Sequence, residues 1–182
     1  MSNNVNNPPA LVAQETAAWC FAAAELMARN FYNLATPTQY AIARASMMAL
    51  VEAQAPPTFA QWNQATEDDL VNNQDENAGA NRQSQRVQLV RNAYGAINHA
   101  AIHGQMTNDY TELQFKADID DGDIVIIGNA IHYYVVYGYD DTDPKNFTLR
   151  VRDPWPRNVG GQRQTIPHSE LATWNNRVVI HF

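Results

Sequence analysis

The chain has 182 residues, of which 45% are hydrophobic and 17% charged, so it is expected to fold as one globular domain or two small ones. Its formal net charge of −7 disfavours nucleic acid and anionic membranes as partners, because both attract basic surfaces. No apolar run approaches the roughly 20 residues that cross a bilayer, and the N-terminal stretch MSNNVNNPPA is interpreted as a solvated lead-in, not a secretory signal.

Two helices are predicted near the start of the chain. Residues 16–32 place alanine, leucine, methionine and aromatic side chains at helical spacing. The second helix is expected to begin in TPTQY, where Thr36 can cap, Pro37 suits the first position and Gln39 completes a capping box. It should run to about Gln54, before two prolines stop it.

Helical patterns and polar stretches continue to about residue 118. In chain order we expect a helix over 58–71, a polar loop over 72–83, a helix over 84–102 and a short helix or turn near Thr111–Ala117.

From residue 123 the pattern is typical of strands. Runs rich in β-branched and aromatic residues are separated by turn-forming residues, and they are DIVIIG, HYYVVYGYD, FTLRVRD and RVVIHF. In FTLRVRD, Thr148, Arg150 and Arg152 should share one face. Helices followed by strands with short connections predict an α+β fold with an antiparallel sheet. We expect a single domain, with a helical half over about 10–118, a sheet half over about 119–182 and a cleft between them.

Cys20 is the only cysteine and falls in the first turn of the first predicted helix. Unpaired backbone N–H groups at a helix N-terminus favour the thiolate, which is a nucleophile. Without further residues, a cysteine in an alanine-rich helix is a small buried hydrophobe. The catalytic interpretation predicts an accessible, reactive thiol and requires a histidine from another part of the fold.

The chain has five histidines, of which His132 is the candidate partner. It begins the predicted strand HYYVVYGYD, where it can project from the rim of a sheet into a cleft. His99 and His103 form an H-x-x-x-H pair, but no third ligand accompanies them and no metal site is predicted. We expect His168 to lie on the surface and His181 to be structural.

Four separated sequence elements share one pattern of spacing. Gln14 precedes Cys20 by six residues, and an aromatic residue and three alanines follow the cysteine. HYYVVYGYD carries a glycine six residues after its histidine, and DPW begins with Asp153. In this chain order they resemble the nucleophile, histidine and aspartate or asparagine segments of the papain-like cysteine proteases. The compact size and the DPW form look most similar to bacterial members, among them effector proteases of plant pathogens and bacteriocin-processing peptidases.

The resemblance implies a papain-like fold and a Cys-His-Asp mechanism. Cys20 would attack a carbonyl carbon, His132 would deliver a proton to the leaving group and Asp153 would orient the imidazole. Gln14 would bind the oxyanion together with the backbone N–H of the cysteine. Each of these polar residues also has a structural alternative, namely a helix-start contact for Gln14, a sheet-edge position for His132 and a turn for Asp153.

Three function classes remain open at this point. The leading hypothesis is a cysteine endopeptidase that cleaves protein or peptide substrates through an acyl-enzyme and needs no cofactor. The alternative is a Cys-His-Asp amidase, deamidase or transglutaminase-like acyltransferase acting on peptidoglycan or protein glutamine, which Gln14 disfavours. The third is a binding module with a vestigial site.

The cellular role is predicted only by analogy with the bacterial members. By that analogy the protein is expected to be cytoplasmic in its producer and to be delivered into a target cell, as an effector or toxin, by a specialised secretion system. An immunity or inhibitor protein that blocks the cleft is then the expected partner besides the substrate.

Overall fold

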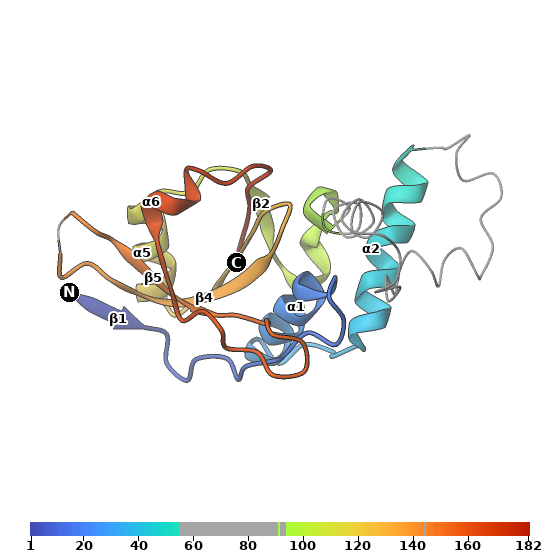
Figure 1. The fold of residues 1–182 in the computed structure, drawn as a ribbon, viewed down its shortest axis with the longest axis horizontal. Coiled ribbons are helices and arrows are strands. Elements are labelled where there is room, and N and C mark those ends of the chain that lie inside the picture. The colour runs from blue at the N-terminus through green and yellow to red at the C-terminus, as the bar shows by residue number, and fades with distance from the viewer. Residues whose placement is uncertain (55–90, 92–93, 144) are drawn as a thin grey trace.

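The computed structural model describes residues 1–54, 91, 94–143 and 145–182. The helix predicted over 58–71 and the loop predicted over 72–83 lie outside these ranges, as do residues 84–90, 92 and 93 of the helix predicted over 84–102. Figure 1 shows the described part as a sheet with its own small helices at one end and α1 and α2 at the other.

Except for α6, the described helices fall in the parts of the chain where the hydrophobic periodicity predicted them, and α6 lies in the half where only strands were expected. Their bounds are α1 (Cys20–Phe31), α2 (Gln39–Gln54), the 3-10 helix η1 (His99–Ile102), α5 (Glu112–Asp121) and α6 (His168–Leu171). None of them is long and apolar enough to cross a membrane, as far as the described ranges extend.

The start of α2 differs from the prediction. Thr38, and not Thr36, caps the helix, because its hydroxyl accepts the backbone N–H three residues further on at 3.1 Å. Gln39 completes no capping box, since its side chain instead bonds the backbone of Ala13 and Glu15, in the segment that leads to Cys20.

The described strands form one seven-stranded antiparallel sheet. Their bounds are β1 (Ser2–Asn4), β2 (Gln105–Thr107), β3 (Val125–Gly128), β4 (Tyr133–Asp140), β5 (Thr148–Arg152), β6 (Thr165–Pro167) and β7 (Val178–His181). The order across the sheet is β2-β7-β3-β4-β5-β6, and β1 pairs with β4. The four predicted strands are present as β3, β4, β5 and β7, and in β5 the side chains alternate between buried and half-buried, as expected. The predicted α+β fold is therefore confirmed.

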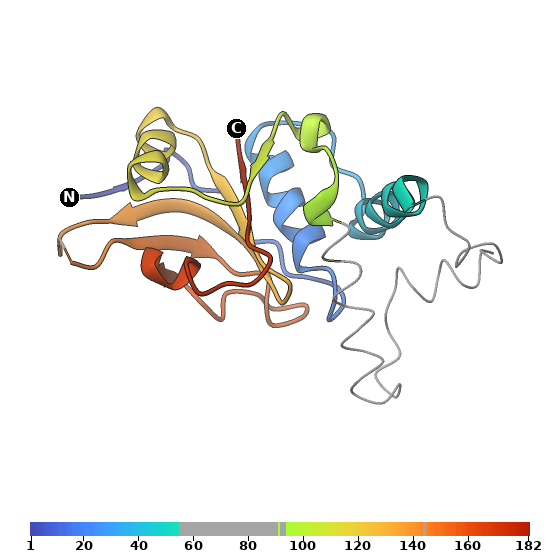
Figure 2. The ribbon, with the colours of Figure 1, turned by 90° about the horizontal axis from the view of Figure 1, so that it is seen from above.

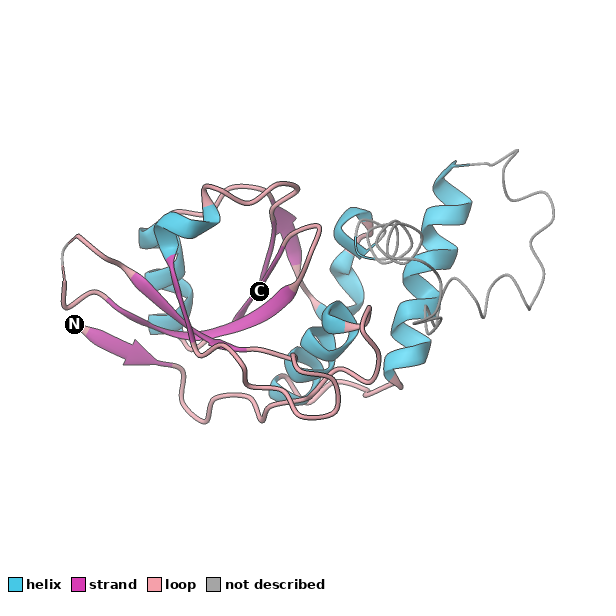
Figure 3. Ribbon diagram, viewed as in Figure 1, coloured by secondary structure: helices cyan, strands magenta, loops and turns pink. Residues whose placement is uncertain are grey.

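The interpretation of the N-terminus as a solvated lead-in was wrong. The side chains of Ser2, Asn3 and Asn4 are exposed, but their backbones pair with residues 138–140 of β4, and Val5 after them is buried. Gly138 permits this approach, because a Cβ at that position would collide with the side chain of Asn4 and the backbone of Asn3. A long loop, drawn in pink in Figure 3, then leads from β1 to the start of α1.

The contact between helices and sheet positions the site. α1 packs against β3 and β4, while α5 and α6 lie on opposite sides of β4 and β5 (Figure 2). At this junction the buried rings of Phe21, Tyr94 and Tyr133 form one aromatic cluster, with centroids 4.8 Å apart for Phe21 and Tyr94 and 5.3 Å apart for Tyr94 and Tyr133. Tyr133 directly follows the candidate histidine, so this cluster fixes the helix that carries Cys20 against the strand that carries His132.

Candidate active site

Cys20 is the first residue of α1, and Trp19 before it is the N-cap residue, whose side chain makes no capping hydrogen bond to the helix. The first N–H groups of a helix have no acceptor within the helix, so the thiol lies at the positive end of the helix dipole. The expectation of an accessible thiol was wrong for this conformation, because Cys20 is 0% exposed.

A tight turn holds His132 at the start of β4. The Asn129 side chain accepts hydrogen bonds from the N–H groups of Ile131 (2.7 Å) and His132 (2.9 Å), and the Asn129 N–H donates to the His132 carbonyl at 3.0 Å. The ring of Tyr134 lies edge-on to the imidazole, 4.6 Å away between centroids. The backbone and the ring of His132 are therefore both restrained.

Asp153 is the buried partner of this histidine. Its Oδ1 lies 2.6 Å from His132 Nε2 and also accepts the Trp155 N–H at 2.9 Å, while Oδ2 accepts the Arg163 N–H at 3.0 Å. With three bonds to it, the carboxylate is fixed in place and its burial is compensated. Because Nε2 is engaged by Asp153, the other ring nitrogen, Nδ1, is the one left for Cys20.

The charges of this group favour a thiolate–imidazolium pair. Burial raises the pKa of Cys20, but the charges of His132 and Arg91 and their hydrogen bonds outweigh burial and lower it to about 7. Burial lowers the pKa of His132, but the charge of Cys20 and the hydrogen bond to Asp153 outweigh burial and raise it to about 9. Between these values the sulfur is anionic and the imidazole cationic.

Gln14 is fully buried in the loop that leads to Cys20. Its N–H donates to the Pro154 carbonyl at 3.0 Å and its carbonyl accepts the Asn158 N–H at 2.9 Å, so it is attached to the loop that follows Asp153. Its Nε2 donates to the Thr16 carbonyl at 2.6 Å, which leaves the second amide hydrogen for another acceptor. The Gln14 Oε1 atom is buried without a hydrogen-bond partner among the described residues.

Two residues of this region were not predicted from the sequence. Gln39 brackets Gln14, because its Oε1 accepts the Glu15 N–H at 3.0 Å and its Nε2 donates to the Ala13 carbonyl at 2.8 Å. Arg91 donates to the carbonyl of Ala17 at 3.1 Å and acts on the thiol of Cys20. Neither residue is near Cys20 in the sequence, so no local spacing pattern could have indicated them.

The other histidines lie apart from this group. His99 is buried in η1, while His103 is exposed and left-handed (φ 61°) at its end, so the pair does not share the face of a regular helix. No cluster of three or more metal-ligating side chains occurs within the described ranges. His168 is less exposed than expected, since its Nε2 lies 2.9 Å from the Tyr110 carbonyl, and His181 packs its ring 5.1 Å from that of Tyr110.

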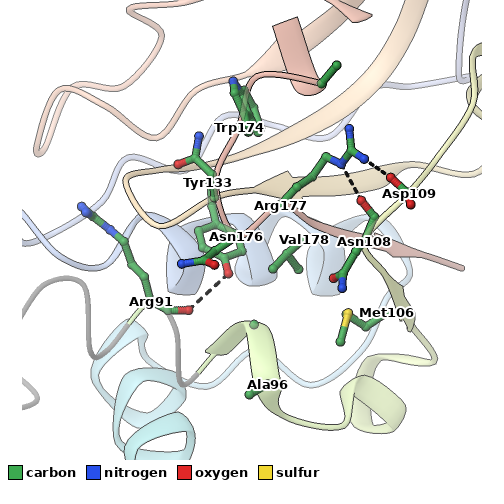
Figure 4. A pocket seen from close by; sticks show the side chains of 13 residues that line it. Arg91, Ala96, Met106, Asn108, Asp109, Tyr133, Trp174, Asn176, Arg177 and Val178 are labelled. Carbon is green, nitrogen blue, oxygen red and sulfur yellow. Dashed lines mark hydrogen bonds and ion pairs between the residues drawn. The ribbon is translucent and has the colours of Figure 1, made fainter. Parts of the chain in front are cut away.

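A cavity of about 780 Å³ lies beside the site, and Gly95 and Ala96 form part of its wall. Asn129, three residues before His132, is among the lining residues, and so are Tyr133, Trp174 and Val178, which Figure 4 labels. In that view the Tyr133 hydroxyl donates to the main-chain carbonyl of Arg91, and the Arg91 side chain extends away from the other labelled residues.

A cysteine at a helix start, opposed by a histidine–aspartate pair on an antiparallel sheet, is the arrangement of papain-like cysteine peptidases. The model of the Peptidase_C39 like family matches residues 8–178, so the chain belongs to that family. This match confirms the predicted superfamily, whereas the bacterial effector branch and the catalytic roles of Cys20, His132, Asp153 and Gln14 stay predictions.

Comparison with solved structures and with curated proteins adds no further information on the family of this chain. The described fold is similar to the structure of UfSP from C. elegans, with a TM-score of 0.47 and 14% identity, over 98% of this chain and 33% of that one. The chain therefore spans about a third of the length of that protein chain. No match was found among the curated proteins.

Proposed function

We propose that the protein is a cysteine endopeptidase that cleaves protein or peptide substrates through an acyl-enzyme. The observation that carries this proposal is the 2.6 Å contact between His132 Nε2 and Asp153 Oδ1, which directs the free ring nitrogen to Cys20 at the start of α1. The membership of the Peptidase_C39 like family supports the same chemistry.

Acylation begins from the thiolate–imidazolium pair. The Cys20 sulfur attacks the carbonyl carbon of the scissile bond, and the electron pair of the carbonyl moves onto its oxygen. His132 then gives the proton on Nδ1 to the nitrogen of the leaving amine, and the C–N bond breaks as the thioester forms. Asp153 keeps the ring in place by accepting from Nε2 throughout.

Deacylation uses the same groups in reverse. The now neutral His132 takes a proton from a water molecule, which attacks the thioester carbon and releases the new carboxyl end of the substrate. In both steps the second amide hydrogen of Gln14 and the N–H of Cys20 are the proposed donors to the oxyanion. Fixed donors need no reorganisation when the charge forms, which is the role proposed for the bonds from Gln39 and the 154–158 loop that hold Gln14.

The cavity beside His132 is the proposed binding region for a substrate side chain. Its volume of about 780 Å³ lies in the usual range for ligand pockets, and Tyr133, Trp174, Met106 and Val178 give it apolar walls. Because Cys20 is fully buried in the described conformation, productive binding requires a local shift that opens a path to the sulfur.

The activity is tested by comparing the wild type with Cys20→Ala in bacterial cells. New protein N-termini that appear with the wild type and not with Cys20→Ala would support an endopeptidase. Converted glutamines or cross-linked proteins without new termini would instead indicate the deamidase or transglutaminase-like chemistry, and released peptidoglycan fragments would indicate an amidase.

The pH dependence of the purified enzyme is a separate test. The rate of cleavage should rise as Cys20 ionises near pH 7 and fall as His132 loses its proton near pH 9.

We further propose that the enzyme acts as an effector or toxin inside a target cell and is held inactive in its producer by an immunity protein. This proposal rests on the resemblance to bacterial papain-like proteases. Expression in a bacterial cytoplasm should stop growth for the wild type and not for Cys20→Ala. Normal growth with a demonstrably active enzyme would contradict an antibacterial role.

A further inference from the structure

Arg91 places a guanidinium next to the loop that leads into α1. The residue is 9% exposed, and its Nη2 donates to the carbonyl of Ala17 at 3.1 Å. Ala17 lies three residues before Cys20 and in the same loop as Gln14. The guanidinium is therefore fixed beside the segment that carries both the proposed nucleophile and the proposed oxyanion donor.

The main chain of Arg91 is attached to the other side of the site. Its carbonyl accepts the hydroxyl of Tyr133, the residue after His132, at 3.3 Å (Figure 4). Three residues further on, Tyr94 packs between Phe21 of α1 and Tyr133 of β4. Arg91 is thus anchored to the helix side through its side chain and to the sheet side through its backbone.

The charge of Arg91 has no carboxylate partner among the residues that the structure describes. Its Nε is buried without a hydrogen-bond partner there, although burying a guanidinium is costly unless an anion compensates it. Arg91 acts on Cys20, because both its charge and a hydrogen bond help to lower the pKa of this thiol, and in its ionised form the sulfur can compensate the guanidinium.

We propose that Arg91 is a positioning residue of the active site, whose guanidinium stabilises the anionic sulfur of Cys20 together with His132 and secures the loop before α1. This role rests on the proposed function, in which the sulfur must be anionic to attack. In this proposal two cations, Arg91 and the imidazolium of His132, stabilise the thiolate of Cys20 together with the dipole of α1. Arg91 matters most at acidic pH, where the thiolate is least populated.

The test is a pH titration of the thiolate by its ultraviolet absorbance, with the Cys20→Ala protein subtracted as background. Cys20 is the only cysteine, so the difference reports this residue alone, and the measurement needs neither a substrate nor access for a reagent. The variants are Arg91→Gln, which keeps a donor for the Ala17 carbonyl without the charge, Arg91→Met, which removes both, and Arg91→Lys, which keeps the charge. Arg177→Met is the matched control, since Arg177 lines the same cavity but pairs with Asp109.

Removing the charge should raise the midpoint of thiolate formation by about one pH unit in Arg91→Gln and Arg91→Met, as expected for the loss of an interacting cation. Arg91→Lys should keep most of the wild-type midpoint, and Arg177→Met should not move it. Circular dichroism and thermal melting identify the folded variants, and either neutral variant suffices if the other does not fold. An unchanged midpoint in a folded neutral variant, or an equal shift in Arg91→Lys, would overturn the proposal. Absence of peptidase activity would contradict the proposed function and leave this titration readable.

Discussion

His132 and His99 are both largely enclosed by the protein, and their pKa values move in opposite directions. At His132 the charge of Cys20 and the hydrogen bond to Asp153 overcome burial and raise the pKa to about 9. At His99, which is 3% exposed, burial dominates and lowers the pKa to about 4. The Nε2 atom of His99 is buried without a hydrogen-bond partner among the described residues, and only the backbone of Tyr94 bonds the ring.

A carboxylate that lines the same cavity is therefore not enough to charge a histidine. His99 lines a cavity of about 350 Å³ together with Glu25 and Arg29. Glu25 pairs with Arg29 at 2.7 Å and so is already neutralised. Asp153, in contrast, receives its other bonds from backbone N–H groups, which fix it without cancelling its charge, and its Oδ1 is directed at the imidazole.

Removing the thiol should have the largest effect on activity, and it also tests why the pKa values of His132 and His99 differ. Cys20→Ala should lower peptidase activity by on the order of 10⁴-fold or more, because no other group can form the acyl-enzyme. It also removes the anion beside His132, so the pKa of His132 should fall from its value of about 9, while that of His99 should stay near 4. Histidine ring signals followed by NMR across pH give both values, and an unmoved His132 would contradict the ion pair.

Changing the aspartate separates charge from orientation. Asp153→Ala frees the ring to rotate and should lower kcat by on the order of 10³-fold, since a displacement of about 1 Å alone can cost 10²-fold. Asp153→Asn keeps an acceptor and should retain more activity than Asp153→Ala. Equal loss in both variants would show that the negative charge itself is required, and full activity in both would reduce Asp153 to a turn residue.

Gln14→Ala should lower kcat without changing the pKa of His132 or that of His99. The expected loss in kcat is roughly 10²–10³-fold, or about 2.7–4 kcal/mol, because one oxyanion donor disappears. The pKa values of His132 and His99 should remain where they are. Gln162→Ala, at an exposed glutamine, is the matched control, and kcat within a few-fold of wild type in Gln14→Ala would remove Gln14 from the site.

Protonation of His99 should lower the stability of the fold at acidic pH, and replacing His99 should leave the activity at neutral pH unchanged. Its pKa is lower in the folded protein than the ordinary 6.5, so protonation favours the unfolded chain. The stability is complete above about pH 6.5 and should decrease by about 3 kcal/mol as the pH falls to about 4. His99→Asn, which keeps a donor for the Tyr94 backbone, should lose less stability over this range in urea unfolding.

His103→Asn is the control for that measurement. His103 is exposed and left-handed, a conformation that asparagine adopts easily, so this variant should follow the wild-type pH dependence. Identical curves for His99→Asn and the wild type would show that His99 is not the group that titrates.

The sequence predicted elements that repeat a pattern over several residues. α1 and the strands β3, β4, β5 and β7 bury apolar residues at regular spacing, and all were expected. β1, β2 and β6 were missed because each has three residues and little apolar character, and their pairing depends on a partner strand far along the chain.

The same distinction holds for the candidate site. Cys20, His132, Asp153 and Gln14 were predicted because each lies in a short segment of recognisable form. Gln39 and Arg91 act through backbone contacts 24–26 and 74 residues away in sequence, and such contacts leave no local signature. Thr38 replaced Thr36 as the cap of α2 for a related reason, since Gln39 is taken up by the loop before Cys20.

The pairing of β1 with β4 also bears on how the protein behaves in solution. β3 covers one edge of β4 only as far as Val136, and β1 continues that cover over Gly138, Tyr139 and Asp140. Without β1, the exposed N–H and C=O groups of this segment could recruit a strand from another molecule. Deleting residues 1–5 is therefore expected to make the protein prone to self-association, through an edge that belongs to the strand directly after His132.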